Sequence, residues 1–327
     1  MPVQRRVVVI GSGRVGGAAV GAIVATGCVE EVVVLNRHHG AACGQAADQA
    51  DAAAWSVSSP VRVRAGGLED LAGASLVVVT VGSLPRSQAP DGRREVAAAN
   101  ASILRPLLCE IASRSADAPV LISTNPVDAM VQVAATEFPF APGRVLGTGT
   151  SLDSVRLRRV IADRFGVSVS SVEAVMLGEH GPAGFPLLSG ASVGGARLAD
   201  VARALPGAPG ALADPESLRE KANAIGWDIR RLKGATSAGI GQCIARIARA
   251  VVRDEMSVVP VSSFIPPGEG WDGVGDEAGV AVSVPCVVGA AGVIRRIPVH
   301  LDDWERECFR SSVEAVRATV AHIAPGP

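Results

Sequence analysis

Short runs of β-branched residues alternate with alanine-rich stretches in the first half of the chain. We expect buried strands at residues 7–10, 32–35, 61–64, 76–81 and 120–123, because unbroken apolar runs of this length are typical of strands covered on both faces. Residues 14–26, 41–54 and 94–114 have helical composition between them. This alternation predicts an α/β fold with a doubly wound parallel sheet.

The pattern changes in the second half. Helices are expected at about 152–165, 215–232 and 236–253, with a closing amphipathic helix at 302–323. Shorter strands are expected near 172–177, 257–264, 280–288 and 293–298, and surface loops at 206–213 and 266–275. We therefore expect a mixed α+β second domain, and a boundary that divides the chain into residues 1–147 and 148–327.

Composition and charge narrow the class of protein. The chain has 327 residues, 48% hydrophobic and 19% charged, which describes a folded globular protein. Its net charge of −1 argues against a broad surface for nucleic acid or anionic membrane. The six cysteines are scattered without a CxxC pair, so we expect free thiols and no metal site. With no expected signal peptide and no apolar run long enough to span a bilayer, we expect a cytoplasmic protein.

A glycine-rich sequence follows the first expected strand and opens the first expected helix. It reads Gly11-Ser12-Gly13-Arg14-Val15-Gly16. The first glycine permits a tight turn, the second lets the backbone approach a pyrophosphate, and the third lets helix and strand pack closely. The helix N-terminus then offers free N–H groups to phosphates. We expect residues 1–147 to form a dinucleotide-binding Rossmann domain, and residues 148–327 the substrate-binding catalytic domain.

The end of the second expected strand bears on the choice of dinucleotide. A site for NAD usually carries Asp or Glu here, which binds the adenosine ribose and repels a 2′-phosphate. This chain has neutral Asn36 followed by Arg37. A guanidinium without a neighbouring acid suits a 2′-phosphate, so NADP(H) is favoured as cofactor. The alternative is NAD(H), with Asn36 still bound to the ribose and Arg37 in solvent.

Two short motifs contain residues suited to proton transfer. They are Gly178-Glu179-His180-Gly181 and, upstream, Leu152-Asp153-Ser154-Val155-Arg156. A histidine can shuttle a proton near neutral pH, and an aspartate can orient it and stabilise its charge. An arginine can grip a carboxylate at two points. These are the parts needed to protonate a carbonyl that stands next to a carboxylate.

With these motifs, the chain resembles the lactate/malate dehydrogenase family over nearly its whole length. It also carries Ser123-Thr124-Asn125-Pro126-Val127-Asp128 and Lys233-Gly234-Ala235-Thr236-Ser237, in family order and at family-like spacing. The resemblance implies an oxidoreductase that transfers a hydride between a nicotinamide cofactor and a 2-oxo or 2-hydroxy carboxylic acid. It also implies a homodimer or homotetramer.

The resemblance implies a role for individual residues. His180 would donate the proton to the 2-oxo group during reduction and accept it in the reverse direction. Asp153 would orient His180 and stabilise the imidazolium, and Arg156 would bind the substrate carboxylate. Further residues would line the substrate and cofactor sites, namely Val81, Gly82, Asn100, Asn125, Thr236 and Ile240.

In the family, the segment at residues 81–94 closes over the substrate. Spacing from Asn100 selects Arg93 as the arginine that polarises the carbonyl, with Arg94 next. Arg86 stands near the position where malate enzymes bind a distal carboxylate, so a malate-like substrate is preferred. The segment is one or two residues longer than in common malate enzymes, which leaves a bulky monocarboxylate open, with Gln88 facing it.

Two other positions depart from the family pattern. Pro182 follows the histidine motif where lactate enzymes commonly have Asp, and Glu173 stands where sugar-phosphate-activated enzymes place a histidine. A glutamate would repel a phosphate, so we expect no such activation. Reduction of a C=N bond beside a carboxylate remains an alternative, since the same residues would serve. A non-catalytic dinucleotide sensor and an NAD-dependent glycoside hydrolase are disfavoured, the latter because a Cys–His metal pattern is missing.

Overall fold

The computed structural model describes residues 5–55, 60–83, 90–204, 214–269, 271 and 279–323, with the backbone alone for residues 90–95. The strands in chain order are β1 (Arg6–Ile10), β2 (Glu31–Leu35), β3 (Arg62–Ala65), β4 (Leu76–Val79), β5 (Val120–Ile122), β6 (Val145–Gly147), β7 (Val172–Glu173), β8 (Met176–Leu177), β9 (Phe185–Pro186), β10 (Ser192–Val193), β11 (Ala196–Arg197), β12 (Ser257–Ile265), β13 (Val280–Gly289) and β14 (Gly292–Arg296). The α-helices are α1 (Arg14–Ala25), α2 (His39–Ala54), α3 (Pro90–Arg114), α4 (Val127–Glu137), α5 (Ser151–Phe165), α6 (Leu198–Ala204), α7 (Pro215–Lys233), α8 (Ala238–Val252) and α9 (Asp303–Val320), with short 3₁₀ turns at Leu68–Leu71 and Val169–Ser171.

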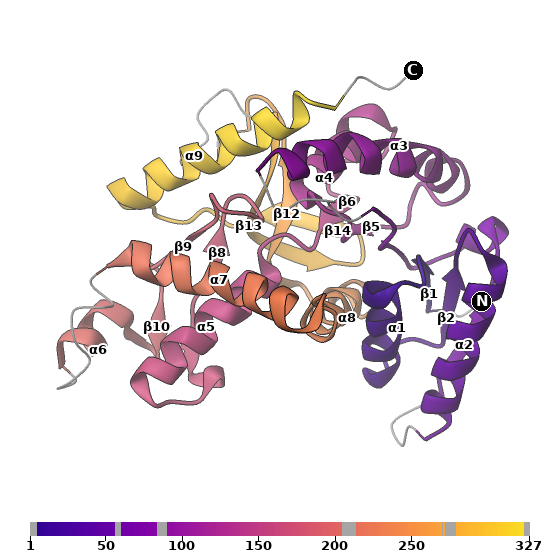
Figure 1. The fold of residues 1–327 in the computed structure, drawn as a ribbon, viewed down its shortest axis with the longest axis horizontal. Coiled ribbons are helices and arrows are strands. Elements are labelled where there is room, and N and C mark those ends of the chain that lie inside the picture. Colours follow the sequence, from indigo (N-terminus) through magenta and orange to yellow (C-terminus); the bar gives the residue numbers. More distant parts are fainter. Residues whose placement is uncertain are drawn as a thin grey trace.

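A nine-stranded sheet runs through the described part of the molecule, in the order β14-β13-β12-β6-β5-β4-β1-β2-β3 (Figure 1). Strands β3, β2, β1, β4, β5 and β6 are parallel, whereas β12, β13 and β14 continue the sheet antiparallel. Ser262 of β12 pairs with Gly147 of β6 at the junction. The predicted doubly wound parallel sheet is confirmed.

Alternating side chains of each central strand enter two different cores. In β1, Val7 and Val9 join a cluster that includes residues of α1, α8 and α9. Val8 and Ile10 join the cluster on the other face, which includes residues of α3 and α4. This two-sided burial explains the unbroken apolar runs of the sequence. Helices α1 and α8 pack together on their side of the sheet (Figure 1).

The second half adds a smaller core beside the sheet. Residues of α5, α7, β7 and β8 form a third cluster, which includes Leu157, Ile161, Met176 and Leu218. The predicted α+β character of this half is confirmed by its helices, by its antiparallel strands, and by two small sheets, β11-β10-β7 and β8-β9. The division of the chain at residues 147 and 148 stays a prediction.

Several element boundaries differ from the sequence predictions. The strand expected at 172–177 is two strands, because residues 174 and 175 leave the ladder between β7 and β8. Helix α3 begins at Pro90 rather than at 94, so residues 90–93 are not loop. Pro90 fits there because the first turn of a helix needs no proline N–H. Strand β4 ends at Val79 instead of residue 81. Helices α4 and α6 and the short strands β6, β9, β10 and β11 lacked a prediction.

Candidate active site

A cavity of about 560 Å³ lies where the glycine-rich turn, the carboxyl ends of β5 and β6, and helices α5 and α7 meet. Its wall includes Val15, Ser123, Asn125, Thr148, Leu152, Asp153, Arg156, His180, Gly181, Pro182, Glu216, Arg219, Glu220, Asn223, Ala224, Gly226, Trp227, Arg230, Thr236 and Ile240. Ligands of α/β sheets bind outside the carboxyl ends of the strands. The three residues of the predicted proton-transfer set share this wall with Val15, Asn125, Thr236 and Ile240.

His180, Asp153 and Arg156 form one connected group. His180 Nδ1 lies 2.6 Å from Asp153 Oδ2, and Arg156 Nη1 donates to Asp153 Oδ1 over 2.8 Å. Asp153 and Arg156 are both buried. They lie three residues apart on α5, which places them on the same face of the helix. If the carboxylate accepts from Nδ1–H, the Nε2 atom is left for a substrate.

The ionisation of Asp153 is controlled by these two partners. Burial alone would raise the pKa of its carboxyl group, but the charges and hydrogen bonds of His180 and Arg156 outweigh burial and hold the pKa below its usual value. Asp153 is therefore an anion at neutral pH. A buried anion that contacts the imidazole favours the protonated form of that ring.

The turn that carries His180 is fixed by close packing behind it. Gly178 has a φ of +83°, and a Cβ atom there would lie 2.2 Å from Ser312 Oγ of α9. Its backbone N–H and C=O both pair with Ser283 of β13. A larger residue would be strained and would displace α9. Pro182, the departure from the family pattern, lies next to the same turn and lines the cavity.

Helix α7 leaves room for the guanidinium of Arg156. A Cβ atom on Gly226 would lie 2.9 Å from Arg156 Nη1. Arg156 Nε is buried, and within the described ranges it has no hydrogen-bond partner. A buried donor without a partner costs free energy, and a carboxylate ligand would remove that cost.

The glycine-rich turn has the form that a dinucleotide needs. Gly11 has a φ of +109°, and a Cβ on Gly16 would lie 1.8 Å from the Gly11 carbonyl oxygen. A Cβ on Gly13, by contrast, would meet nothing within 4 Å, so the backbone here faces open space. Gly13 precedes α1, whose N-terminus lacks a capping side chain. These residues therefore fit a diphosphate placed against the helix N-terminus.

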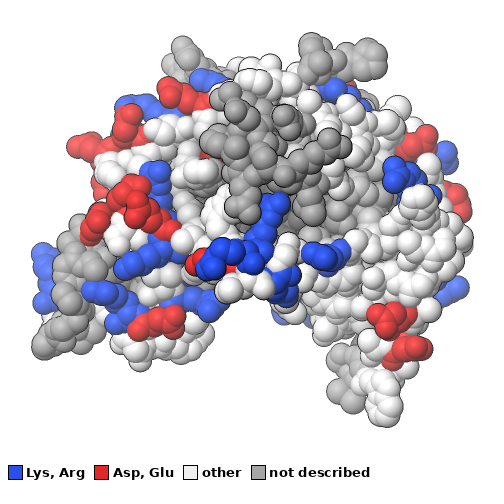
Figure 2. Space-filling view, viewed as in Figure 1, with Lys and Arg blue, Asp and Glu red and all other residues white. Residues whose placement is uncertain are grey.

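Asn36 at the end of β2 is held by protein groups. Its Nδ2 donates to Ser12 Oγ over 2.5 Å, and its Oδ1 accepts the backbone N–H of His38 over 2.9 Å. Arg37 is exposed, as is Arg14 on the first turn of α1. Figure 2 shows Lys and Arg side chains gathered near the middle of the viewed face, over α7 and α8.

Asn100 of α3 is buried and bonded to two segments, one of which lines the cavity through Asn125. Its Oδ1 accepts the backbone N–H of Ser83 over 2.7 Å, and its Nδ2 donates to the carbonyl oxygen of Asn125 over 2.6 Å. Thr124 Oγ1 donates in turn to the Val81 carbonyl oxygen. Gly82 lies between these residues, since a Cβ there would be 3.0 Å from Thr124 Cγ2.

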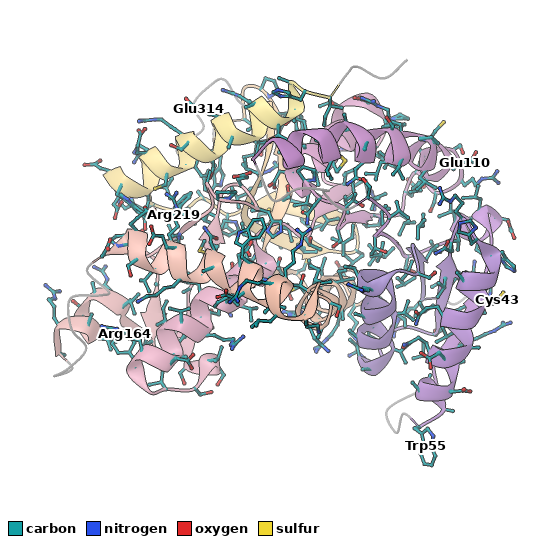
Figure 3. All side chains as sticks on the ribbon, in the orientation of Figure 1. Cys43, Trp55, Glu110, Arg164, Arg219 and Glu314 are labelled. Atoms are coloured by element: carbon teal, nitrogen blue, oxygen red, sulfur yellow. The ribbon has the colours of Figure 1, made fainter. Side chains whose placement is uncertain are left out.

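Sequence reasoning missed one face of α7. Glu216, Arg219, Glu220, Asn223, Trp227 and Arg230 all line the cavity. Arg219 forms an ion pair with Glu216, and Figure 3 shows it between α7 and α9. Trp227 is 42% exposed. The spacing of three and four residues along this helix was the available signal.

Part of the expected arginine segment lies outside the described residues. Arg86 and Gln88 lie outside the described residues. Arg93 and Arg94 lie in the first turn of α3, but their side chains are outside the described part as well. Glu173 of β7 forms an ion pair with Arg158 of α5 at 3.2 Å.

The described ranges hold no group of three or more His, Cys, Asp or Glu side chains that could bind a metal ion. No helix within them combines the length and apolar character that crossing a bilayer requires.

Comparisons with known proteins agree with this geometry. Residues 5–147 match the NAD binding domain of lactate/malate dehydrogenase, and residues 150–324 match its alpha/beta C-terminal domain. The chain is 36% identical to an L-lactate dehydrogenase of Thermus aquaticus (97% of this chain, 99% of the relative) and 35% identical to one of Nitratidesulfovibrio vulgaris (98% and 100%).

Solved structures agree as well. A lactate dehydrogenase from a deep-sea metagenome library of the Medee basin superimposes with a TM-score of 0.90 at 30% identity, covering 98% of this chain and 99% of the other. A minor L-lactate dehydrogenase of Enterococcus mundtii gives a TM-score of 0.90 at 29% identity, covering 99% and 100%. The two matched domains, together with the Asp153–His180 pair at their shared cavity, show that this chain belongs to the lactate/malate dehydrogenase family.

Proposed function

We propose that the protein is a 2-oxo acid reductase that uses NADP(H) in preference to NAD(H) and takes a malate-like substrate. The observation that carries the reaction type is the contact of His180 with Asp153 over 2.6 Å, beside Arg156, in the wall of a cavity that also contains Val15 of the glycine-rich turn. Family membership makes the protein a nicotinamide-dependent 2-hydroxyacid dehydrogenase. The cofactor preference, the substrate and the residue roles are our proposals.

In the proposed reduction, the substrate carboxylate binds the guanidinium of Arg156. It accepts a hydrogen bond from the buried Nε–H or from the neighbouring N–H groups. This contact orients the 2-oxo group toward His180 Nε2. The nicotinamide, when bound, supplies the hydride to the carbonyl carbon. His180 gives its proton to the carbonyl oxygen, and Asp153 stabilises the imidazolium until the proton has left. Oxidation of the 2-hydroxy acid uses the same groups in reverse.

The remaining site residues are assigned by position. Asn125, Thr236 and Ile240 line the cavity and would contact the substrate and the nicotinamide. Gly11, Gly13, Arg14, Val15 and Gly16 would hold the diphosphate, with Val81 and Gly82 near the nicotinamide. Asn100 would act through Ser83 and Asn125, because both ends of its amide are already bonded to them. Arg93 is proposed to polarise the carbonyl.

Three features support NADP(H). The strand end lacks an acid, Asn36 is already bonded to Ser12, and the exposed Arg37 is free of any described ion pair. A 2′-phosphate would gain a charge-assisted hydrogen bond from Arg37 and would meet no repulsion from residue 36. NAD(H) remains the alternative cofactor.

Two arginines support a second anionic group on the substrate. Arg86 was assigned that role from its sequence position. Arg230 on α7 lines the cavity and forms no ion pair within the described residues. It lies one helical turn beyond Gly226, which contacts the Arg156 guanidinium, so two guanidinium groups share one wall. A bulky monocarboxylate, packed on Trp227, is the alternative.

A substrate and cofactor panel tests the proposal. Oxaloacetate, pyruvate, and branched and aromatic 2-oxo acids are each reduced with NADPH and with NADH. We expect higher kcat/KM with NADPH and with the dicarboxylate. Preference for NADH would refute the cofactor assignment, and indifference to the distal carboxylate would refute the substrate assignment. Addition of a cyclic imino acid to the panel tests the C=N alternative.

A His180→Asn variant tests the reaction type itself. We expect it to lose turnover while cofactor binding, measured by quenching of tryptophan fluorescence, stays unchanged. A protein that senses the dinucleotide without catalysis would be unaffected in both.

We also infer a cytoplasmic homodimer or homotetramer, which the family resemblance and the free cysteines support. Light scattering on the purified protein tests the oligomer.

A further inference from the structure

A second carboxylate contacts the histidine turn, through the backbone of His180. Asp128 lies in the first turn of α4 and is 3% exposed. Its Oδ2 accepts the backbone N–H of His180 over 2.7 Å. Asp128 ends the sequence motif that begins at Ser123, but it has no part in the reaction scheme above.

The burial of this carboxylate is costly. Asp128 Oδ1 is enclosed by protein and, in the part of the chain that the structure describes, it has no hydrogen-bond partner of normal geometry. The hydroxyl of Ser262 on β12 is also buried without such a partner. A buried, incompletely bonded carboxylate lowers the stability of the folded state unless something compensates for it. A neutral side chain could accept the His180 N–H without that cost, so the charge itself needs a reason.

The carboxyl group of Asp128 ionises close to neutral pH. Burial raises the pKa of Asp128 to about 6, although the Ser262 hydroxyl, the His180 N–H and the His180 charge each lower it. The attraction between Asp128 and a protonated His180 is reciprocal. A negative Asp128 must therefore favour the protonated ring to the same extent.

We propose that Asp128 is a positioning residue that fixes the backbone of His180 and, together with Asp153, supplies the negative charge that favours its protonated imidazole. The inference rests on the proposed role of His180. In this arrangement Asp153 acts on ring atom Nδ1, and Asp128 acts on the main chain of the same residue. The proton donor is thereby held from two elements, α5 and α4.

The other titratable or charged groups near the pair are few. Asp153 and Arg156 face it from α5, and Glu179 lies on the same turn and opposes ionisation of Asp128. Cys243 of α8 is close to Asp153 and Arg156, but burial raises the pKa of its thiol to about 12, so it stays neutral. Helix α7 adds Glu216, Arg219, Glu220 and Arg230 across the cavity.

An Asp128→Asn variant separates the charge from the hydrogen bond, because the amide oxygen can still accept the His180 N–H. The titration of His180 is followed by NMR on histidine-labelled protein without substrate. We expect its midpoint to move to lower pH by about one unit. Asp163→Asn, which removes an exposed acid from α5, should leave the midpoint unchanged. An unchanged midpoint in Asp128→Asn would overturn the proposal.

The wild-type protein provides a second measurement that needs no variant. The ¹³Cγ resonance of Asp128 reports its ionisation directly, and the backbone amide resonance of His180 should shift in the same pH step. An amide that is silent in that step would overturn the proposal even if the variant failed to fold. Because neither measurement uses turnover, a protein that reduced no 2-oxo acid would count against the proposed function and not against this coupling.

Discussion

The side-chain amide of Asn100 donates a hydrogen bond to the backbone carbonyl of Asn125 over 2.6 Å. Through its oxygen, the same amide holds the backbone of Ser83. One buried residue of α3 thus connects the segments that follow β4 and β5, and the segment after β5 lines the cavity through Ser123 and Asn125. The shape of the nicotinamide end of the site therefore depends on a group that we do not expect to touch the reacting atoms.

Replacement of Asn100 by alanine should lower stability and weaken cofactor binding together. The change removes the hydrogen bonds of the buried amide to the Ser83 N–H and the Asn125 carbonyl, each worth about 0.5–1.5 kcal/mol. Urea unfolding and the KM for the cofactor measure the two effects. Ser102→Ala, an exposed change on the same helix, should alter neither. Normal stability with an unchanged KM would contradict the role of Asn100.

Asp153→Asn should reduce kcat on the order of a hundredfold or more. The amide can still contact Nδ1, but it can no longer stabilise the imidazolium, and Arg156 loses its buried counter-charge. Steady-state kinetics with a 2-oxo acid measure the effect, with Asp163→Asn as the matched control. A kcat close to that of the wild type would show that the carboxylate does not support the proton transfer.

The buried Glu31 should make stability sensitive to acid. It pairs with Arg6 at 2.6 Å and Arg64 at 2.8 Å. Burial alone would raise its pKa, but these arginines outweigh burial and lower the pKa below the ordinary value of 4.5. The folded protein therefore binds this proton less tightly than the unfolded chain. The stabilisation is fully present above pH 4.5 and is lost as the pH falls through the lower folded value.

A Glu31→Gln variant tests this dependence. It should be less stable than the wild type by about 3 kcal/mol at pH 7, and the difference should shrink toward pH 3. Urea unfolding at several pH values gives both numbers. Glu30→Gln, its exposed neighbour, is the control. A difference that does not vary with pH would place the effect in packing rather than in charge.

Asn36→Asp should shift the cofactor preference toward NADH. The new carboxylate can still accept the His38 N–H. The Ser12 hydroxyl, which accepts from Asn36 Nδ2 in the present chain, can rotate to donate to it, so the local fold should survive, but the carboxylate would repel a 2′-phosphate. We expect the ratio of kcat/KM for NADPH over NADH to fall on the order of tenfold. Arg37→Gln should lower kcat/KM for NADPH alone. If both variants keep the wild-type ratio, the 2′-phosphate is bound elsewhere or is not bound.

Arg230→Gln should discriminate between substrates by charge. We expect it to raise KM for oxaloacetate on the order of tenfold, with little change for pyruvate. Arg231→Gln removes the adjacent arginine, which is exposed and ion-paired with Asp228, and should change neither constant. Equal losses for both acids would place Arg230 in cofactor binding instead.

The sequence predicted the central sheet because its strands are buried on both faces. The run in β1 has no polar break, because Val7 and Val9 enter one core while the alternating Val8 and Ile10 enter the core on the other face. The chemistry of His180 and Asp153 was predictable because each residue lies within a short sequence motif. Strand β6 was missed because it has only three residues, whereas α4 was missed although its 11 residues are an ordinary helix length.

The rest of the site depends on contacts that no local pattern contains. The placement of Arg156 against Gly226 joins helices α5 and α7 from separate parts of the chain. The same holds for Asp128, whose partner His180 lies 52 residues further on. Burial does not follow from residue type alone either: Trp55 is large and apolar, yet it is 90% exposed at the end of α2 (Figure 3).

The pairing of Ser262 with Gly147 limits how the chain could be cut. Because β12 completes the edge of β6, a fragment ending at residue 147 would present an unpaired strand of buried residues to solvent. Such edges recruit other strands and promote aggregation. The complementary fragment would in turn lose the strand against which β12 docks. Each half of this sequence therefore depends on the other to cover this edge of the sheet.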